Sequence, residues 1–416
     1  MPSGLLLDPR GTFAASHIED LFGHDRLART LLRTVSRFRG GNVVLVQGAP
    51  GSGKRHLLQR CAYLLQHERD MLGFDAHASV NPQWGWYNPW TYQRHGNLLA
   101  GFVAAIARAS LQPAQAIDRA RELVTLVNRL QFDGVAEGGG TGIGSPHEAD
   151  PALRIRDGIG RLVELVRGGR PGRMVLFIDD MDLLSPAMRL HLLEGFRLLI
   201  APSTELTVVA SLGREAATAA IREREGDLDA DTAVRCLEEY VDLGITVPNV
   251  DIRRIGPLLR HYLAPHEPHM MRAFGSDAVM GLIAAATNDH LGTPRFLQKL
   301  AVRVGQLSEF ALETRHTREL SEAQWAWVII SERWPGFRRH MIRGGRDRWV
   351  ELQHSMKELH TGTTEDTRRS RRKKGLITWL RDDLLLADYL RLHADGFERD
   401  AEGIYWLETL LLAAGL

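Results

Sequence analysis

Residues 42–65 read NVVLVQGAPGSGKRHLLQRCAYLL, and this stretch decides the fold. An apolar run suited to a buried strand comes first, a glycine-rich turn follows it, and a helical pattern follows the turn. Gly48, Gly53 and Lys54 have the GxxxxGK spacing of a phosphate-binding loop, the Walker A motif. In such a loop backbone N–H groups surround phosphate oxygens, and the lysine reaches the β and γ phosphates. The stretch therefore predicts a bound nucleoside triphosphate.

The residues expected to contact the nucleotide form the loop and the first turn of the helix after it: Gly48, Ala49, Pro50, Gly51, Ser52, Gly53, Lys54, Arg55 and His56. One of them departs from the motif. Arg55 stands where a serine or threonine would place a hydroxyl on Mg²⁺, and a guanidinium has no acceptor atom. We therefore expect ATP as the ligand, with Mg²⁺ binding weakened and hydrolysis slowed. The alternative interpretation is a glycine turn that merely joins a strand to a helix.

A second motif follows at residues 174–182, which read MVLFIDDMD. An apolar strand that ends in carboxylates has the form of a Walker B site, because α/β sheets bind ligands at the carboxyl ends of their strands. Asp179 is the expected Mg²⁺ ligand, and Asp180 stands where a base or a water-positioning group is needed. Asp182 is interpreted as a helix cap or a supporting residue. The alternative is an ordinary strand end, which a Walker A motif in the same chain disfavours.

Strands and helices alternate through this part of the chain. A helix with Asp25 as its N-cap precedes the loop, and a strand at residues 205–213 ends near Ser211, a candidate sensor of the γ-phosphate. Further helices are expected at residues 117–130, 153–166 and 186–200. Alternation of this kind implies right-handed crossovers and a doubly wound parallel sheet. The fold class is therefore α/β, a P-loop NTPase sheet followed by an all-helical lid and C-terminal helices.

The chain is expected to divide into an N-terminal extension (1–21), a nucleotide-binding core (22–249), a helical lid (250–346) and a C-terminal helical tail (347–416). The core contains a glycine-rich insertion at residues 134–151, interpreted as a flexible surface segment. The tail contains the basic run RRSRRKK at residues 368–374. Without interleaved aromatic residues, this run predicts only non-specific anion binding.

Composition limits the function further. The chain has 416 residues, of which 44% are hydrophobic and 25% are charged, so a main domain with smaller parts is expected. The formal net charge of +1 gives no overall field that would attract nucleic acid or a membrane. Cys61 and Cys236 have no disulfide or metal spacing, which suits a reducing compartment. No stretch reaches the roughly 20 apolar residues of a spanning helix. We expect a cytoplasmic protein that binds neither membrane nor nucleic acid.

Four motifs in order give the chain a family resemblance, and they span residues 22–337. The chain resembles the KAP family of P-loop NTPases, a STAND-like branch, with a degenerate Walker A motif. After the loop, the match to an FNxW-type segment rests on Tyr87, Asn88, Pro89, Trp90 and Tyr92. The match to the family's IDDLDR segment rests on Ile178, Asp179, Asp180, Met181 and Asp182. The later PR and RWP motifs are matched by Pro294, Arg295, Arg333, Trp334 and Pro335.

The resemblance implies a switch that closes its helical lid on ATP and signals to a partner. Arg295 would then reach the γ-phosphate, a contact that ADP cannot make, and the alternative is a salt bridge within the lid. Arg55, Leu183 and Gly213 replace polar residues of the family pattern, so any ATPase activity is expected to be low. The second function in view is a pseudo-NTPase scaffold that binds a protein through its aromatic and C-terminal helices. A protein partner is expected in both cases, and oligomerisation is compatible with both.

Overall fold

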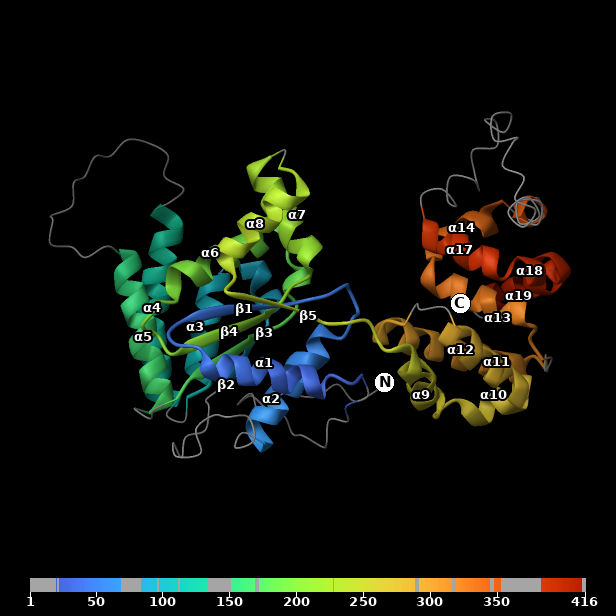
Figure 1. The fold of residues 1–416 in the computed structure, drawn as a ribbon, viewed down its shortest axis with the longest axis horizontal. Helices are drawn as coiled ribbons and strands as arrows, with labels where there is room; N and C mark the ends of the chain where they lie inside the picture. Colours follow the sequence, from blue (N-terminus) through green and yellow to red (C-terminus); the bar gives the residue numbers. More distant parts are fainter. Residues whose placement is uncertain are drawn as a thin grey trace. The chain divides into compact units, whose positions relative to one another are not determined.

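The computed structural model describes residues 20, 22–68, 84–95, 97–110, 113–133, 151–168, 172–226, 228–288, 292–315, 319–344, 348–352 and 383–413. The predicted glycine-rich insertion up to residue 150, the basic run and nearly all of the N-terminal extension lie outside these residues. The chain forms two compact units, Met1–Pro248 and Asn249–Leu416 (Figure 1). The four-part division expected from the sequence is finer and stays a prediction.

The first unit is built on a parallel sheet. Its strands are β1 (Asn42–Gln47), β2 (Trp84–Tyr87), β3 (Met174–Ile178), β4 (Leu206–Ser211) and β5 (Leu243–Thr246), in the order β2-β3-β4-β1-β5. Every pairing is parallel, so all strands end at the same edge. β4 lies between β1, which leads into the Walker A loop, and β3, which ends at the Walker B acids. The predicted parallel sheet is confirmed.

Helices cover both faces of the sheet (Figure 1). Alternate residues of β1 point to opposite faces, so Val44 and Val46 pack with α1 (Asp25–Arg37) and α2 (Lys54–His67). Val43 and Leu45 belong to the core on the other face. The helices of that face are α3 (Leu98–Arg108), α4 (Pro113–Asp133), α5 (Pro151–Arg167), α6 (Pro186–Leu199), α7 (Arg214–Glu225) and α8 (Ala230–Tyr240). The fold is therefore doubly wound.

The 3-10 helices η2 (Pro89–His95) and η3 (Met181–Leu183) follow β2 and β3 at the edge where the site lies.

The predicted N-cap of α1 is wrong, because the helix begins at Asp25 and its N-cap is His24. The Asp25 carboxylate instead pairs with Arg60 of α2, so it joins the two helices that flank the loop.

Among the residues that the structure describes, the second unit contains helices and no strand. Its helices are α9 (Ile252–Leu263), α10 (Glu267–Phe274), α11 (Ser276–Asn288), α12 (Pro294–Glu313), α13 (Glu322–Arg333), α14 (Pro335–Arg343), α17 (Leu384–Leu392), α18 (Ala394–Arg399) and α19 (Ala401–Ala413). A buried polar cluster joins α13, α14 and α19: the Arg338 guanidinium pairs with Glu408 at 2.7 Å, and Trp327 Nε1 donates to Glu408 at 2.6 Å. Among the described helices, none is long and apolar enough to cross a membrane.

Candidate nucleotide site

The loop between β1 and α2 has the backbone that the motif predicts. Gly51 and Gly53 have positive φ angles of 83° and 96°, a region that L side chains rarely adopt. Gly53 is the N-cap of α2, and a Cβ placed there would lie 2.8 Å from His24 Cε1. The loop therefore turns sharply into the helix, and the positive end of the α2 dipole lies at the loop.

Lys54 is buried and its amino group is fully engaged. Nζ donates to the carbonyl oxygens of Gly48 at 2.7 Å and Ala49 at 3.1 Å, and it lies 2.9 Å from Asp182 Oδ2. The other oxygen of Asp182 accepts a hydrogen bond of 2.7 Å from the backbone N–H of Gly213. Asp182 thus joins the Walker A lysine to the end of β4. The sequence interpretation of Asp182 as a supporting residue missed this direct contact.

Asp179 lies at the end of β3 with its side chain almost fully buried. Ser211 Oγ, at the end of β4, donates to Asp179 Oδ1 at 3.1 Å. Burial, together with the neighbouring charge of Asp180, raises the pKa of Asp179 from 3.8 to about 6, and the Arg55 charge opposes that rise. Ser211 orients this carboxylate, and its predicted role as a γ-phosphate sensor stays a prediction.

Asp180 is held in place by a residue that the sequence did not single out for this role. Its backbone is left-handed, with φ 60°, and Asn88 Nδ2 donates to Asp180 Oδ2 at 2.8 Å. Asn88 follows the last residue of β2, next to the end of β3. The signal in the sequence that could have pointed to Asn88 as a site residue was its position in the aromatic segment. Of that segment Tyr87 is buried and Trp90 is exposed, so it serves partly as core and partly as surface.

Arg55 lies against both Walker B acids. Its Nε is 3.1 Å from Asp179 Oδ2, and its Nη1 is 3.5 Å from Asp180 Oδ2. Asp179 Oδ2 has no hydrogen bond within the described part of the chain, so its contact with Arg55 is ionic rather than directional. The Arg55 side chain is 56% exposed, so its other N–H groups can reach solvent or an anion.

The residues around this position do not fit Mg²⁺. The ion requires near-octahedral oxygen ligands at roughly 2.0–2.1 Å, and both expected carboxylates already contact a guanidinium. The position after Lys54 supplies no oxygen. For Asp179 to hold the metal, Arg55 would have to leave it.

The loop region does fit a phosphate group. The Ser52 hydroxyl is buried, and its Oγ has no hydrogen-bond partner among the residues that the structure describes. Such an unsatisfied group calls for a ligand or water. A cavity of about 280 Å³ borders the loop at Gly48–Pro50 and extends along the start of α7 at Gly213–Ala216.

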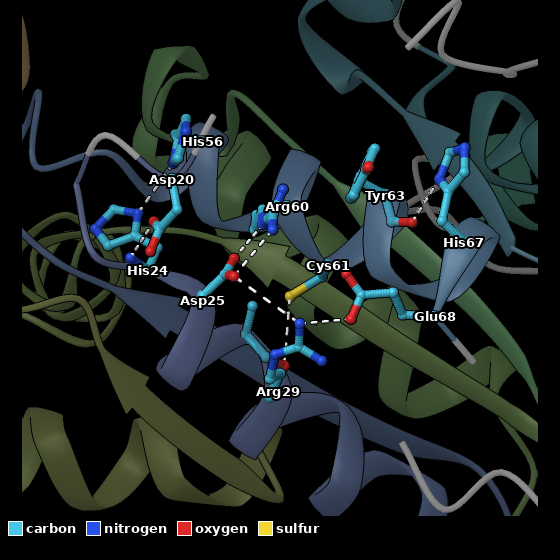
Figure 2. A network of polar contacts seen from close by, with 11 residues as sticks. Asp20, His24, Asp25, Arg29, His56, Arg60, Cys61, Tyr63, His67 and Glu68 are labelled. Atoms are coloured by element: carbon cyan, nitrogen blue, oxygen red, sulfur yellow. Dashed lines mark hydrogen bonds and ion pairs between the residues drawn. The ribbon is translucent and has the colours of Figure 1, made fainter. Parts of the chain in front are cut away.

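A polar network fixes α1 against α2 beside the loop (Figure 2). Arg60 pairs with Asp25, and Arg29 Nη2 lies 2.5 Å from Glu68 Oε2. At the loop end of the network, His24 Nδ1 and His56 Nδ1 are 3.2 Å apart. Because α1 and α2 are joined in this way, the start of α2, from Gly53 to His56, is held in place against α1.

The predicted site residues therefore fall into two groups. The structure brings Gly48–His56, Asp179 and Asp180 together in the first unit. Arg295 belongs to the second unit, in the first turn of α12, where Thr293 is the N-cap. Arg295 is exposed and has no ion pair within the described ranges, so the alternative of a salt bridge within the lid finds no partner there. Its contact with the nucleotide stays a prediction.

The second unit also contains the RWP motif, which lies where α13 ends and α14 begins. Trp334 Nε1 donates to Asp383 Oδ2 at 2.8 Å, and the Arg333 guanidinium lies 5.9 Å from the centre of the Trp334 ring. Pro335 begins α14. The Trp334 hydrogen bond thus joins the start of α14 to Asp383, the N-cap of α17.

Part of the first unit matches a family of known proteins. Residues 20–224 match the family model described as "AAA ATPase domain". The first unit thus contains an AAA ATPase domain of the P-loop NTPase superfamily, whereas the KAP resemblance stays a prediction. No curated protein matches the chain. Among solved structures, "Structure of the Aeropyrum Pernix ORC2 protein (ADPNP-ADP complexes)" is similar at 11% identity and a TM-score of 0.34, over 95% of this chain and 93% of that one. A likeness this distant says nothing of function.

The raised pKa of Asp179 predicts a pH-dependent cost to stability. The folded state keeps a proton that the unfolded state releases between pH 3.8 and about 6, so this residue's contribution to stability falls as the pH rises through that window. Asp179→Asn should therefore match the wild type near pH 4 and exceed its free energy of unfolding by roughly 1–3 kcal/mol at pH 7.

Urea denaturation of both proteins across this range measures the difference. Asp231→Asn, which removes an exposed carboxylate from α8, is the matched control. A difference for Asp179→Asn that does not change with pH would show that the carboxyl is not perturbed.

Proposed function

We propose that this AAA ATPase domain binds ATP on the loop Gly48–His56 and acts as a nucleotide-dependent switch with slow hydrolysis. The observation that carries the proposal is the position of Lys54, held among two loop carbonyl oxygens and Asp182. An amino group in that position can exchange these partners for phosphate oxygens with little movement of its chain.

The loop supplies the remaining contacts for a triphosphate. Gly51 and Gly53 allow the backbone N–H groups to turn toward an anion, and Ser52 offers its buried hydroxyl. Lys54 would hold the β and γ phosphates as a point charge. Bound ATP would present a γ-phosphate, the group that ADP lacks.

Slow hydrolysis follows from the surroundings of Asp180. A base or water-positioning carboxylate must point at the attacking water, but Asp180 Oδ2 accepts from Asn88 and faces Arg55. Mg²⁺ would reach Asp179 only after Arg55 withdrew from it.

The switch requires a group that senses ATP and ADP differently. Arg295 is the candidate, because an exposed arginine in the first turn of α12 has its planar N–H groups available for a γ-phosphate. A ligand shifts a conformational equilibrium only by its difference in affinity for the two states. A contact made with ATP and lost with ADP provides that difference.

A pseudo-NTPase scaffold is the second candidate function. It is favoured by exposed leucines on α17, since Leu384, Leu385 and Leu392 are 73%, 59% and 64% exposed. Apolar residues that gather on one helix are typical of a surface that binds another protein. A partner bound there would serve either function.

Binding of ATP is tested by Lys54→Ala. The mutation removes a charge-assisted contact of roughly 1.5–3 kcal/mol, so the dissociation constant should rise by about tenfold to a hundredfold. Isothermal titration measures it. Lys299→Ala, at a lysine 62% exposed on α12, removes the same charge and should leave the constant unchanged. Equal affinity in the Lys54→Ala protein and the wild type would contradict a phosphate site at this loop.

Coupling to the second unit is tested by hydrogen exchange on residues 250–337. ATP should protect this segment more than ADP does in the wild type and in Lys299→Ala. Arg295→Ala should abolish the difference while it keeps the affinity for ADP, because only the γ-phosphate contact is lost. If the mutant retains the ATP-specific protection, Arg295 has no part in the switch.

A further inference from the structure

We propose that Arg55 takes the place of Mg²⁺ in this site, so that ATP and ADP bind as free anions without a divalent metal. The inference rests on the proposed function, since it needs nucleotide on the loop Gly48–Lys54. Beyond that function, we infer that the ligand is the metal-free nucleotide and that Arg55 selects it.

The first observation is where the Arg55 charge lies. Arg55 directly follows Lys54 in the first turn of α2, the position from which a P-loop hydroxyl reaches the metal. Its guanidinium is 3.1 Å from Asp179 and 3.5 Å from Asp180. One side chain thus places a positive charge beside both of the carboxylates that would otherwise face a metal.

The second observation is the balance of charge at this edge of the sheet. The carboxylates of Asp179, Asp180 and Asp182 face the ammonium of Lys54 and the guanidinium of Arg55. Without Arg55, a polyanionic phosphate chain would approach two acids that lacked an adjacent cation. A metal-free triphosphate is tolerated only where a fixed positive charge lies between it and those acids.

The third observation is the donor capacity of the guanidinium. It has five N–H groups in a planar fork, and its contacts with Asp179 and Asp180 are made through Nε and Nη1. The side chain is 56% exposed, so further N–H groups can turn to phosphate oxygens. Arg55 can therefore bridge phosphate and carboxylate, as a metal ion does, without an octahedral shell of oxygens.

The test is isothermal titration of the full chain with ATP, once with excess EDTA and once with excess Mg²⁺. The wild type should show dissociation constants within about threefold of each other. Arg55→Thr, which restores the hydroxyl and frees both acids, should bind at least about tenfold more weakly in EDTA than in Mg²⁺. The substitution thus converts a metal-independent site into a metal-dependent one.

The matched control is Arg222→Thr, at an exposed arginine in the last turn of α7. It removes the same charge from the same unit and should bind ATP equally in EDTA and Mg²⁺, as the wild type does. Thermal unfolding of each variant confirms that it is folded, which the exposure of Arg55 and Arg222 leads us to expect.

The outcomes separate this inference from the proposed function. Wild-type protein that binds ATP in Mg²⁺ and not in EDTA overturns the inference and leaves nucleotide binding intact. Arg55→Thr protein that binds equally well in both solutions also overturns it, because Arg55 is then not the cation that matters. Wild-type protein that binds ATP in neither solution overturns the proposed function, and this inference with it.

Discussion

The site depends on one constraint: the three carboxylates gathered at the edge of a parallel sheet each need a cation beside them. β3 ends at Asp179 and Asp180, and Asp182 follows in the next turn. β1 is separated from β3 by β4, and it leads into the loop whose helix begins with Lys54 and Arg55. Lys54 pairs with Asp182, and Arg55 contacts the other two acids. The strand order thus brings the cations of one motif onto the acids of the other.

Much of the fold could be predicted because its signals are local. The apolar runs of β1, β3 and β4 and the periodic helices α4, α5 and α6 lie where the sequence predicts them. β2 and β5 were not anticipated. β2 is Trp84–Tyr87, in a segment rich in aromatic residues and prolines, and β5 is Leu243–Thr246, with a glycine inside it. Edge strands this short obtain their stability from pairing with a neighbour, which a local pattern does not reveal.

The candidate site was predictable as a set of residues but not as a set of contacts. The motifs identify Lys54, Arg55, Asp179 and Asp180. The hydroxyl that is missing at position 55 already predicted weakened Mg²⁺ binding. That Arg55 reaches across to both acids depends on the register of β1, β4 and β3 and on the turn after β3. The same holds for Asn88, which meets Asp180 from a residue 92 positions away. A sequence motif has a fixed short spacing, so it does not predict contacts between residues that lie far apart in the chain.

Arg55 is the proposed reason that ATP bound at the phosphate loop is hydrolysed slowly. Phosphate release in Mg²⁺ by the wild type, Arg55→Thr and the double variant Arg55→Thr with Asp180→Asn tests this most directly. We expect a low rate for the wild type, a rise of about tenfold or more for Arg55→Thr, and loss of that gain in the double variant. Turnover of the wild type at roughly tens per second, within the ordinary catalytic range, would contradict it.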